Sequence, residues 1–216
     1  MSTNKSQFDS AHLLPETVVG PELTPHAPAG RFKRHPEQIL VEQPLAYLNV
    51  QVDGRETSYF EWLGAGIYSA DWRGVAQNDG PHVLHELRYG FSERFFYLRV
   101  DTFPGSWSEL RNLEFRIALR GGAELRLFVA IEEGHFAGCL LDTEELCILG
   151  PHELVEVAFD KILEVAIGRR LLTLAGQPSL ALQVALWQGS LQLELLPRKF
   201  PLEVNLGVEA FAWPAQ

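Results

Sequence analysis

The stretch LEFRIALRGGAELRLFVAI, residues 113–131, decides the fold class. Apolar and polar side chains alternate on both sides of the glycine pair Gly121–Gly122, with apolar residues at every second position. Because successive side chains of a β-strand point to opposite faces, this period of two predicts two half-buried strands. The glycines between them predict a tight turn. We therefore expect an antiparallel hairpin whose register is fixed by its apolar face.

The same alternation recurs on both sides of this hairpin. It predicts further strands over residues 45–54, 95–101, 155–159, 163–167, 180–186, 191–195 and 202–206. In the segment 191–195 the three leucines at odd positions are expected to form the buried face. About nine short strands, each apolar on one face, are typical of antiparallel sheets packed face to face. We predict an all-β, antiparallel β-sandwich of about nine strands, with a β-barrel as the alternative and helical turns only near residues 169–175.

Composition changes near residue 40. Residues 1–40 are rich in Pro, His, Glu and Ser and carry no sustained hydrophobic period. Such a segment buries little apolar surface, so we expect an extended or partly disordered N-terminal lead-in. The remaining residues, 41–216, are long enough to enclose one core and are expected to form a single β-sandwich domain.

Charge and hydropathy narrow the classes of partner. The chain has 28 acidic and 18 basic residues and a formal net charge of −10, which argues against a nucleic-acid partner. It has neither an apolar run long enough to cross a bilayer nor the apolar core of a secretory signal, so we expect a cytoplasmic protein without a membrane partner. In that compartment Cys139 and Cys147 are expected to be reduced thiols, although they could face one another across a hairpin.

Signatures of catalysis are absent from the sequence. There is no glycine-rich phosphate loop, nucleophile elbow, His-Glu-x-x-His helix or Cys-x-x-Cys pair. Glycoside hydrolysis needs two carboxyl groups across a cleft, and the acids nearest the aromatic residues are Glu61, Asp71 and Asp101. On alternating strands such acids are usually solvated, so we predict that the chain is not an enzyme and has no catalytic residues.

Metal binding is the next alternative. His82 and His85 are three positions apart, which places them on opposite faces of a strand and disfavours a shared metal ion. Oxygen ligands for calcium are present in the loop-rich stretch that contains Asp53, Glu61 and Asp71. We expect no cofactor, with a structural calcium ion as the alternative.

Aromatic side chains next to polar ones are the strongest functional signal. Sugars stack their apolar C–H faces on aromatic rings and hydrogen-bond their hydroxyl groups to the polar rim. The rings in loops or at the polar positions of strands are those of Tyr68, Trp72, Trp107 and Trp187. The polar residues expected to bind hydroxyl groups are Asp71, Arg73 and Gln188.

We expect a second group of aromatic residues to be buried instead of available to a ligand. The run YFEWLGAG, residues 59–66, combines three rings with glycines small enough for close backbone approach. We expect Tyr59, Phe60 and Trp62 to pack in the core or between sheets.

Four segments together resemble a known family. They are VDGRETSYFEWLGAGIY (52–68), LRYGFSERFFYLRVD (87–101), ILEVAIGRRLL (162–172) and LQLELLP (191–197). They resemble the C-terminal β-rich region that follows the catalytic part of many bacterial glycoside hydrolase family 57 proteins. The resemblance covers roughly Leu45 to Leu206, and Gly168 stands where many relatives have a proline. More distantly, the chain is similar to the glucodextranase C-terminal domain and to family 9 carbohydrate-binding modules.

The resemblance implies a β-sandwich that accompanies carbohydrate-active enzymes and either binds glycans or packs against the catalytic domain. It also implies a structural calcium ion in some relatives. The leading prediction is therefore a non-catalytic accessory, carbohydrate-binding module of polysaccharide (α-glucan) metabolism. The alternative is a protein-interaction or dimerisation module that docks onto a separate glycoside hydrolase. That alternative depends on apolar residues at outward positions or in the tail, namely Phe95, Phe128, Leu196 and Phe211.

Overall fold

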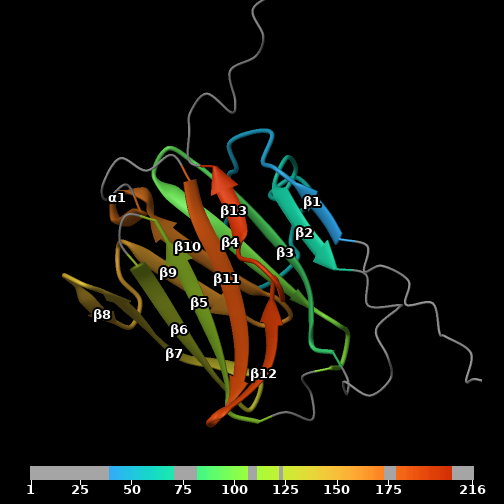
Figure 1. Cartoon of the computed structure of the whole chain (residues 1–216), viewed down its shortest axis with the longest axis vertical. Helices are drawn as coiled ribbons and strands as arrows, with labels where there is room; N and C mark the ends of the chain where they lie inside the picture. Colours follow the sequence, from blue (N-terminus) through green and yellow to red (C-terminus); the bar gives the residue numbers. More distant parts are fainter. Residues whose placement is uncertain (1–38, 71–81, 107–110, 122–123, 173–178, 206–216) are drawn as a thin grey trace, which may run out of the picture. The chain divides into compact units, whose positions relative to one another are not determined.

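The computed structural model describes residues 39–70, 82–106, 111–121, 124–172 and 179–205. All of these residues belong to one compact unit, Arg34–Gln216. Within them the chain forms thirteen strands and one helix of four residues (Figure 1). None of the helices described is long and apolar enough to cross a membrane.

The strands form two antiparallel sheets packed face to face. The first sheet has the order β1 (Ile39–Glu42), β2 (Gly66–Ala70), β3 (Leu84–Phe91), β4 (Phe95–Thr102), β10 (Leu163–Gly168), β9 (Val155–Phe159). The second sheet has the order β12 (Leu191–Leu196), β11 (Ser179–Gln188), β5 (Leu113–Arg120), β6 (Glu124–Glu132), β7 (His135–Thr143), β8 (Cys147–Leu149). The short strand β13 (Leu202–Asn205) also pairs with β11, and α1 (Arg169–Leu172) follows β10. The all-β antiparallel sandwich is confirmed, with thirteen strands instead of about nine.

The hairpin predicted over residues 113–131 is present. Strands β5 and β6 pair in the register Leu119 opposite Leu125 and Arg120 opposite Glu124. Burial alternates along both strands, so their apolar side chains face the first sheet. The core between the sheets includes fully buried residues from both layers, among them Leu87, Tyr89, Phe96, Leu98, Phe115, Ile117 and Leu127.

Residues 45–54 do not form the predicted strand. They lie over the outer face of the first sheet, where the Leu48 N–H donates to the carbonyl of Phe91 at 2.7 Å. Leu48 packs with Trp62, Tyr97 and Ala166 in a second, smaller cluster. A Cβ atom at Gly90 would lie 2.5 Å from Leu48 Cδ1, so the glycine allows this close approach. The alternation of this segment reflects packing on a sheet surface instead of pairing within a sheet.

Strand β12 presents the opposite face to the one expected. Leu196 and Glu194 are buried, whereas Leu191 is exposed. The ladder between β11 and β12 shifts its register between Leu186 and Trp187, at a bulge. The expectation that Leu196 points outward is therefore wrong. Of the other residues in that group, Phe95 and Phe128 are half-buried, and Phe211 lies outside the described residues.

The two cysteines do not face one another. Cys139 is buried on β7, whereas Cys147 on β8 is exposed and lies opposite Asp142. Both are free thiols. Burial raises the pKa of the Cys139 thiol.

Candidate functional site

The outer face of the first sheet is largely covered. Residues 45–65 pass over it and are fastened by Glu164 of β10, whose side chain is completely buried. Its carboxylate accepts hydrogen bonds from the backbone N–H groups of Asp53 and Gly54, at 3.1 and 3.0 Å, and from the indole N–H of Trp62, at 3.0 Å. Burial raises the pKa of Glu164, against the lowering effect of these hydrogen bonds. This acid is a structural anchor for the covering segment.

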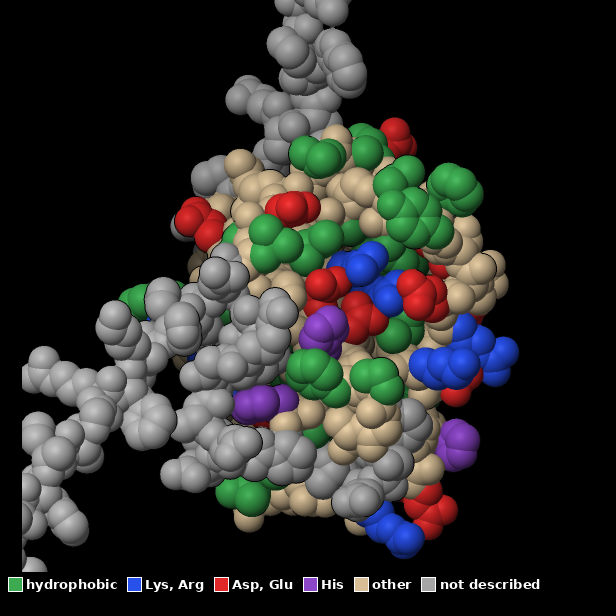
Figure 2. Space-filling view, turned by 90° about the vertical axis from the view of Figure 1, so that its right-hand side faces the viewer, with side chains coloured by type: hydrophobic (Ala, Val, Ile, Leu, Met, Phe, Trp, Pro, Cys, Tyr) green, Lys and Arg blue, Asp and Glu red, His purple; other side chains and the backbone are tan. Residues whose placement is uncertain are grey.

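Charged residues occupy the neighbouring part of the same face. Asp101 is held by two nitrogens of Arg99, at 2.9 and 2.7 Å, and Glu86 by Arg88 at 2.8 Å. Glu56 lies 3.6 Å from Arg99. Figure 2 shows acidic and basic side chains gathered in the middle of one face of the molecule, as expected of such a network.

This network bears on the acids that were considered for glycoside hydrolysis. Burial raises the pKa of Asp101, while the hydrogen bonds and charge of Arg99 oppose the rise. Glu61 accepts hydrogen bonds from the hydroxyl of Thr57 at 2.9 and 3.0 Å. Both acids therefore already have partners within the fold, and Asp71 lies outside the described residues. Asp101 thus belongs to an ion-pair network, whereas Glu61 is hydrogen-bonded to a neutral hydroxyl.

The outer face of the second sheet is more open. Its outward side chains on β5, β6 and the end of β11 are half-buried or exposed, in contrast to the buried Tyr97, Arg99 and Ala166 on the first sheet. In the strand pairing, Trp187 lies opposite Glu114, and Arg116 lies opposite Phe128. The order β11, β5, β6 thus brings these four side chains onto one surface.

Arg116 connects the aromatic rings of this surface. Its guanidinium carbon lies 3.9 Å from the ring centroid of Trp187 and 5.9 Å from that of Phe128. Its Nε donates a hydrogen bond to the carboxylate of Glu114. We call Trp187, Arg116, Phe128 and Glu114 the Trp187 platform. It combines an aromatic surface with charged hydrogen-bonding groups, which is the chemistry that a sugar requires.

Small residues continue the platform sideways. The row that begins with Trp187 and Glu114 runs on through Ala130 of β6 to Gly138 of β7. A Cβ atom at Gly138 would meet no atom within 4 Å, so this part of the sheet surface is open. Because neighbouring strands are about 4.8 Å apart, the row from β11 to β7 is about 14 Å long. A surface of this length suits an extended ligand.

The structure separates the residues predicted to bind sugar. Trp187 is on the outer face and half-buried, as its position in the strand indicated. Gln188 donates its amide N–H to the carbonyl of Arg111 at 3.0 Å, so it supports the loop before β5. Tyr68 is only 3% exposed and faces the core from β2, which corrects the expectation that its ring is available for stacking. The other predicted residues, Asp71, Trp72, Arg73 and Trp107, lie outside the described residues.

The prediction for the run YFEWLGAG is partly wrong. Trp62 is buried against the first sheet, as expected, but Tyr59 and Phe60 are 73% and 76% exposed. Residues 59–64 form turns on top of the sheet. In such a turn only some side chains point toward the sheet, and among the three rings that side chain is Trp62.

In the part of the chain that the structure describes, no three His, Cys, Asp or Glu residues are grouped so that they would hold a metal ion. His82 bonds to Glu194 at 2.7 Å, and His85 packs edge-to-face on Phe103. The carboxylate of Asp53 accepts the backbone N–H of Arg55 at 2.8 Å. These side chains take part in interactions within the fold.

Arg116 and Glu114 were not predicted as candidate site residues, and Phe128 was named only for the protein-interaction alternative. Their signal was present, since they occupy the outward positions of the hairpin that decided the fold class. The sequence did not indicate that β5 pairs with β11 on the side opposite β6. Comparison of the chain with protein-family models, with curated proteins and with solved structures finds no match.

Proposed function

We propose that this chain is a non-catalytic accessory module that binds an α-glucan-like carbohydrate on the outer face of the second sheet. The observation that carries the proposal is the Trp187 platform, in which a guanidinium lies against an indole ring on an open sheet surface. The resemblance to the region that follows family 57 catalytic domains supports the association with polysaccharide metabolism.

The chemistry of the platform matches the two needs of a glycan. The proposal places the C–H faces of the sugar on the ring surfaces of Trp187 and Phe128 that Arg116, which lies over both rings, leaves uncovered. Arg116 and Glu114 offer charged donors and acceptors for hydroxyl groups, and such charge-assisted hydrogen bonds are stronger than neutral ones. Gln192, which is exposed opposite Trp187, adds an amide at the edge of the platform.

Affinity measurements on ring variants test this proposal. Calorimetric titration with soluble starch, glycogen and dextran should show binding to at least one of them. Trp187→Ala should weaken that binding about 10-fold, because an aromatic stack and its buried area together contribute about 1–2 kcal/mol. Trp187→Phe, which keeps a ring, should weaken it less.

Tyr59→Ala is the matched control, because Tyr59 is an exposed ring on the covering segment of the other sheet. The glucan affinity of this variant should equal that of the wild type. The proposal fails if no glucan binds, or if Trp187→Ala and Tyr59→Ala bind as the wild type does.

A second candidate function has its own observation in its favour. Leu45, Tyr59, Phe60 and Leu63 are all highly exposed on the segment over the first sheet. The Leu45 N–H donates to the carbonyl of Gly64 at 2.8 Å, which brings Leu45 close to Leu63 in the fold. Tyr59 and Phe60 pack edge-to-face with ring centroids 5.9 Å apart. Grouped exposed apolar residues of this kind mark protein interfaces.

We propose as the alternative that these four residues dock the chain onto a glycoside hydrolase catalytic domain. The test is size-exclusion chromatography with light scattering on a mixture with a purified glycoside hydrolase family 57 catalytic domain. A complex should form, and the double variant Tyr59→Ser/Phe60→Ser should abolish it while Trp187→Ala leaves it intact. If no complex forms, or if the double variant forms it equally well, this function is excluded.

A further inference from the structure

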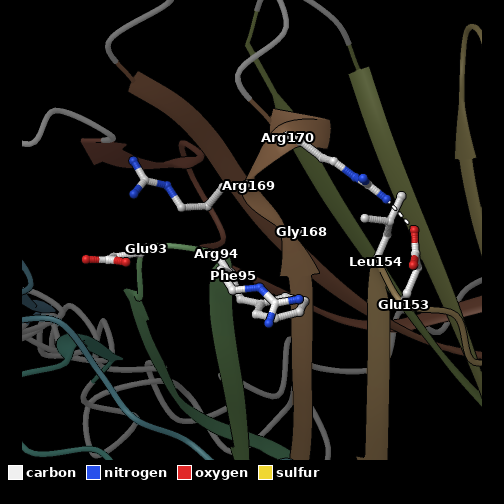
Figure 3. Close-up of a pocket in the computed structure, with 8 residues that line it drawn as sticks. All are labelled: Glu93, Arg94, Phe95, Glu153, Leu154, Gly168, Arg169 and Arg170. Atoms are coloured by element: carbon white, nitrogen blue, oxygen red, sulfur yellow. Dashed lines mark hydrogen bonds and ion pairs between the residues drawn. The ribbon is translucent and has the colours of Figure 1, made fainter.

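A pocket of about 280 Å³ opens at one end of the first sheet, where β4 begins and β10 ends. Residues from this end and from the loop before β9 line it (Figure 3), among them Arg94, Phe95, Glu153, Gly168, Arg169 and Arg170. Phe95 and Gly168 are partners in the pairing of β4 with β10, so the floor of the pocket belongs to the sheet itself. The pocket is built from a different sheet than the Trp187 platform.

The pocket gathers arginine in an acidic chain. Three of its lining residues are arginines and two, Glu93 and Glu153, are acids, so the lining carries a formal net charge of +1. The whole chain, in contrast, has 18 basic and 28 acidic residues. A positive pocket in a negative protein is suited to attract a small anion.

Arg94 is the central cation of the pocket. Its guanidinium carbon lies 5.5 Å from the ring centroid of Phe95. In Figure 3 it extends along this ring, between Arg169 on one side and the Arg170–Glu153 pair on the other. Within the described residues no carboxylate pairs with Arg94. A guanidinium that rests on a ring keeps its N–H groups at the edge, in the planar fork that binds carboxylate or phosphate through two hydrogen bonds.

The neighbouring arginines are held in place by the fold. The backbone N–H of Arg169 donates to the carbonyl of Arg94 at 2.8 Å, and its side chain donates to the carbonyl of Ser92 at 3.3 Å. Arg170 pairs with Glu153 at 2.6 Å, but the two side chains are 63% and 72% exposed. Exposed ion pairs contribute little to stability, so a ligand with a higher charge is able to replace Glu153.

We propose that this pocket binds a phosphate group, carried either by inorganic phosphate or by a small phosphate ester such as a sugar phosphate. A phosphate offers three oxygens and up to two negative charges, and the fork of Arg94 would bind two of these oxygens. Arg170 would join it after release from Glu153. A volume of about 280 Å³ is large enough for a phosphate with a small organic group. This volume is just below the range of about 300–1,000 Å³ that is typical of sites for drug-sized ligands. The proposal is independent of glucan binding.

Calorimetric titration at constant ionic strength tests it, with inorganic phosphate, glucose 1-phosphate and glucose as probes. Wild type should bind at least one of the phosphates and should not bind glucose in this pocket. Arg94→Gln and Arg170→Gln should each lower the phosphate affinity, the first by about 10-fold or more, because hydrogen bonds between charged groups are the strong ones. Arg111→Gln is the matched control, since Arg111 is exposed and lies outside the pocket. Circular dichroism verifies that each variant is folded.

The outcomes separate the two sources of the phosphate. Equal affinity for both phosphates identifies inorganic phosphate as sufficient, and tighter binding of glucose 1-phosphate identifies the ester as the ligand. The proposal is overturned if neither phosphate binds at concentrations up to about 10 mM. It is equally overturned if Arg94→Gln and Arg170→Gln, both folded, bind as tightly as Arg111→Gln.

Discussion

Replacement of Glu164 by alanine should strongly destabilise the protein. Glu164 is completely buried, and its carboxylate accepts three hydrogen bonds, from the N–H groups of Asp53, Gly54 and the Trp62 indole. Alanine removes all three acceptor contacts and leaves a space where the carboxylate was. The three donors would then lie beneath the covering segment without a partner.

The magnitude follows from these contacts. A buried donor without a partner costs about 1–3 kcal/mol, and the donors here are close enough to share part of the loss. Removal of the charge also relieves the cost of burying a carboxylate, which reduces the total. We expect Glu164→Ala to lower the free energy of unfolding by about 3–5 kcal/mol.

Urea denaturation, followed by circular dichroism, measures this quantity. Glu156→Ala is the matched control, because Glu156 lies on the adjacent strand β9, opposite Ala166, and is exposed. The control should change the free energy of unfolding by no more than about 0.5 kcal/mol. A loss below about 1 kcal/mol for Glu164→Ala would show that the carboxylate does not anchor residues 45–65.

Three further predictions follow from burial and close packing. The folded-state pKa of Glu164 is raised above its ordinary value of 4.5, so the folded state favours the protonated side chain. The stabilisation that this protonation adds is fully present below the unfolded-state pKa and is lost as the pH rises through the folded-state pKa. Urea midpoints should therefore show wild type losing stability relative to Glu164→Gln as the pH is raised above the ordinary pKa of 4.5, and parallel curves would contradict this. Gly90→Ala should cost about 1–3 kcal/mol in the same assay, because the new Cβ would lie 2.5 Å from Leu48 Cδ1; an unchanged midpoint would mean that the segment moves away freely. A thiol reagent should modify the exposed Cys147 at once and the buried Cys139, whose pKa is raised by burial, only after unfolding, which mass spectrometry detects; simultaneous modification would contradict the buried position.

Local pattern was sufficient to predict the strands that face one core. In β5 and β6 every second residue is apolar and a glycine pair separates the strands, so periodicity and turn chemistry indicate the same hairpin. In β12 leucine occupies both faces, and the buried face is determined by Glu194. Its carboxylate accepts the N–H groups of Val83 and Leu84, at 2.8 and 2.6 Å, from more than a hundred positions away. No local pattern contains this information.

The same distinction applies to the candidate site. The outward position of Trp187 follows from its strand, and that part of the site was predictable. Arg116 and Phe128 join it only because β11 pairs with β5, a contact between segments about 70 residues apart. Tyr59 and Trp62 were both predicted to be buried, but only Trp62 is. The burial of a side chain in a turn depends on the surface against which the turn packs. That surface consists of β4 and β10, which follow later in the chain.

The strand order has a consequence for synthesis on the ribosome. In the first sheet β4 pairs with β10, and in the second β5 pairs with β11, so each sheet acquires a central ladder from a segment made much later. Until β10 and β11 emerge, β4 and β5 present unpaired edges with their apolar faces exposed. Long-range pairing of this kind folds slowly and leaves the nascent chain open to aggregation. A chain that ends before residue 163, and so lacks both β10 and β11, should therefore accumulate as insoluble material, and expression in a coupled translation system with a pelleting assay would measure it.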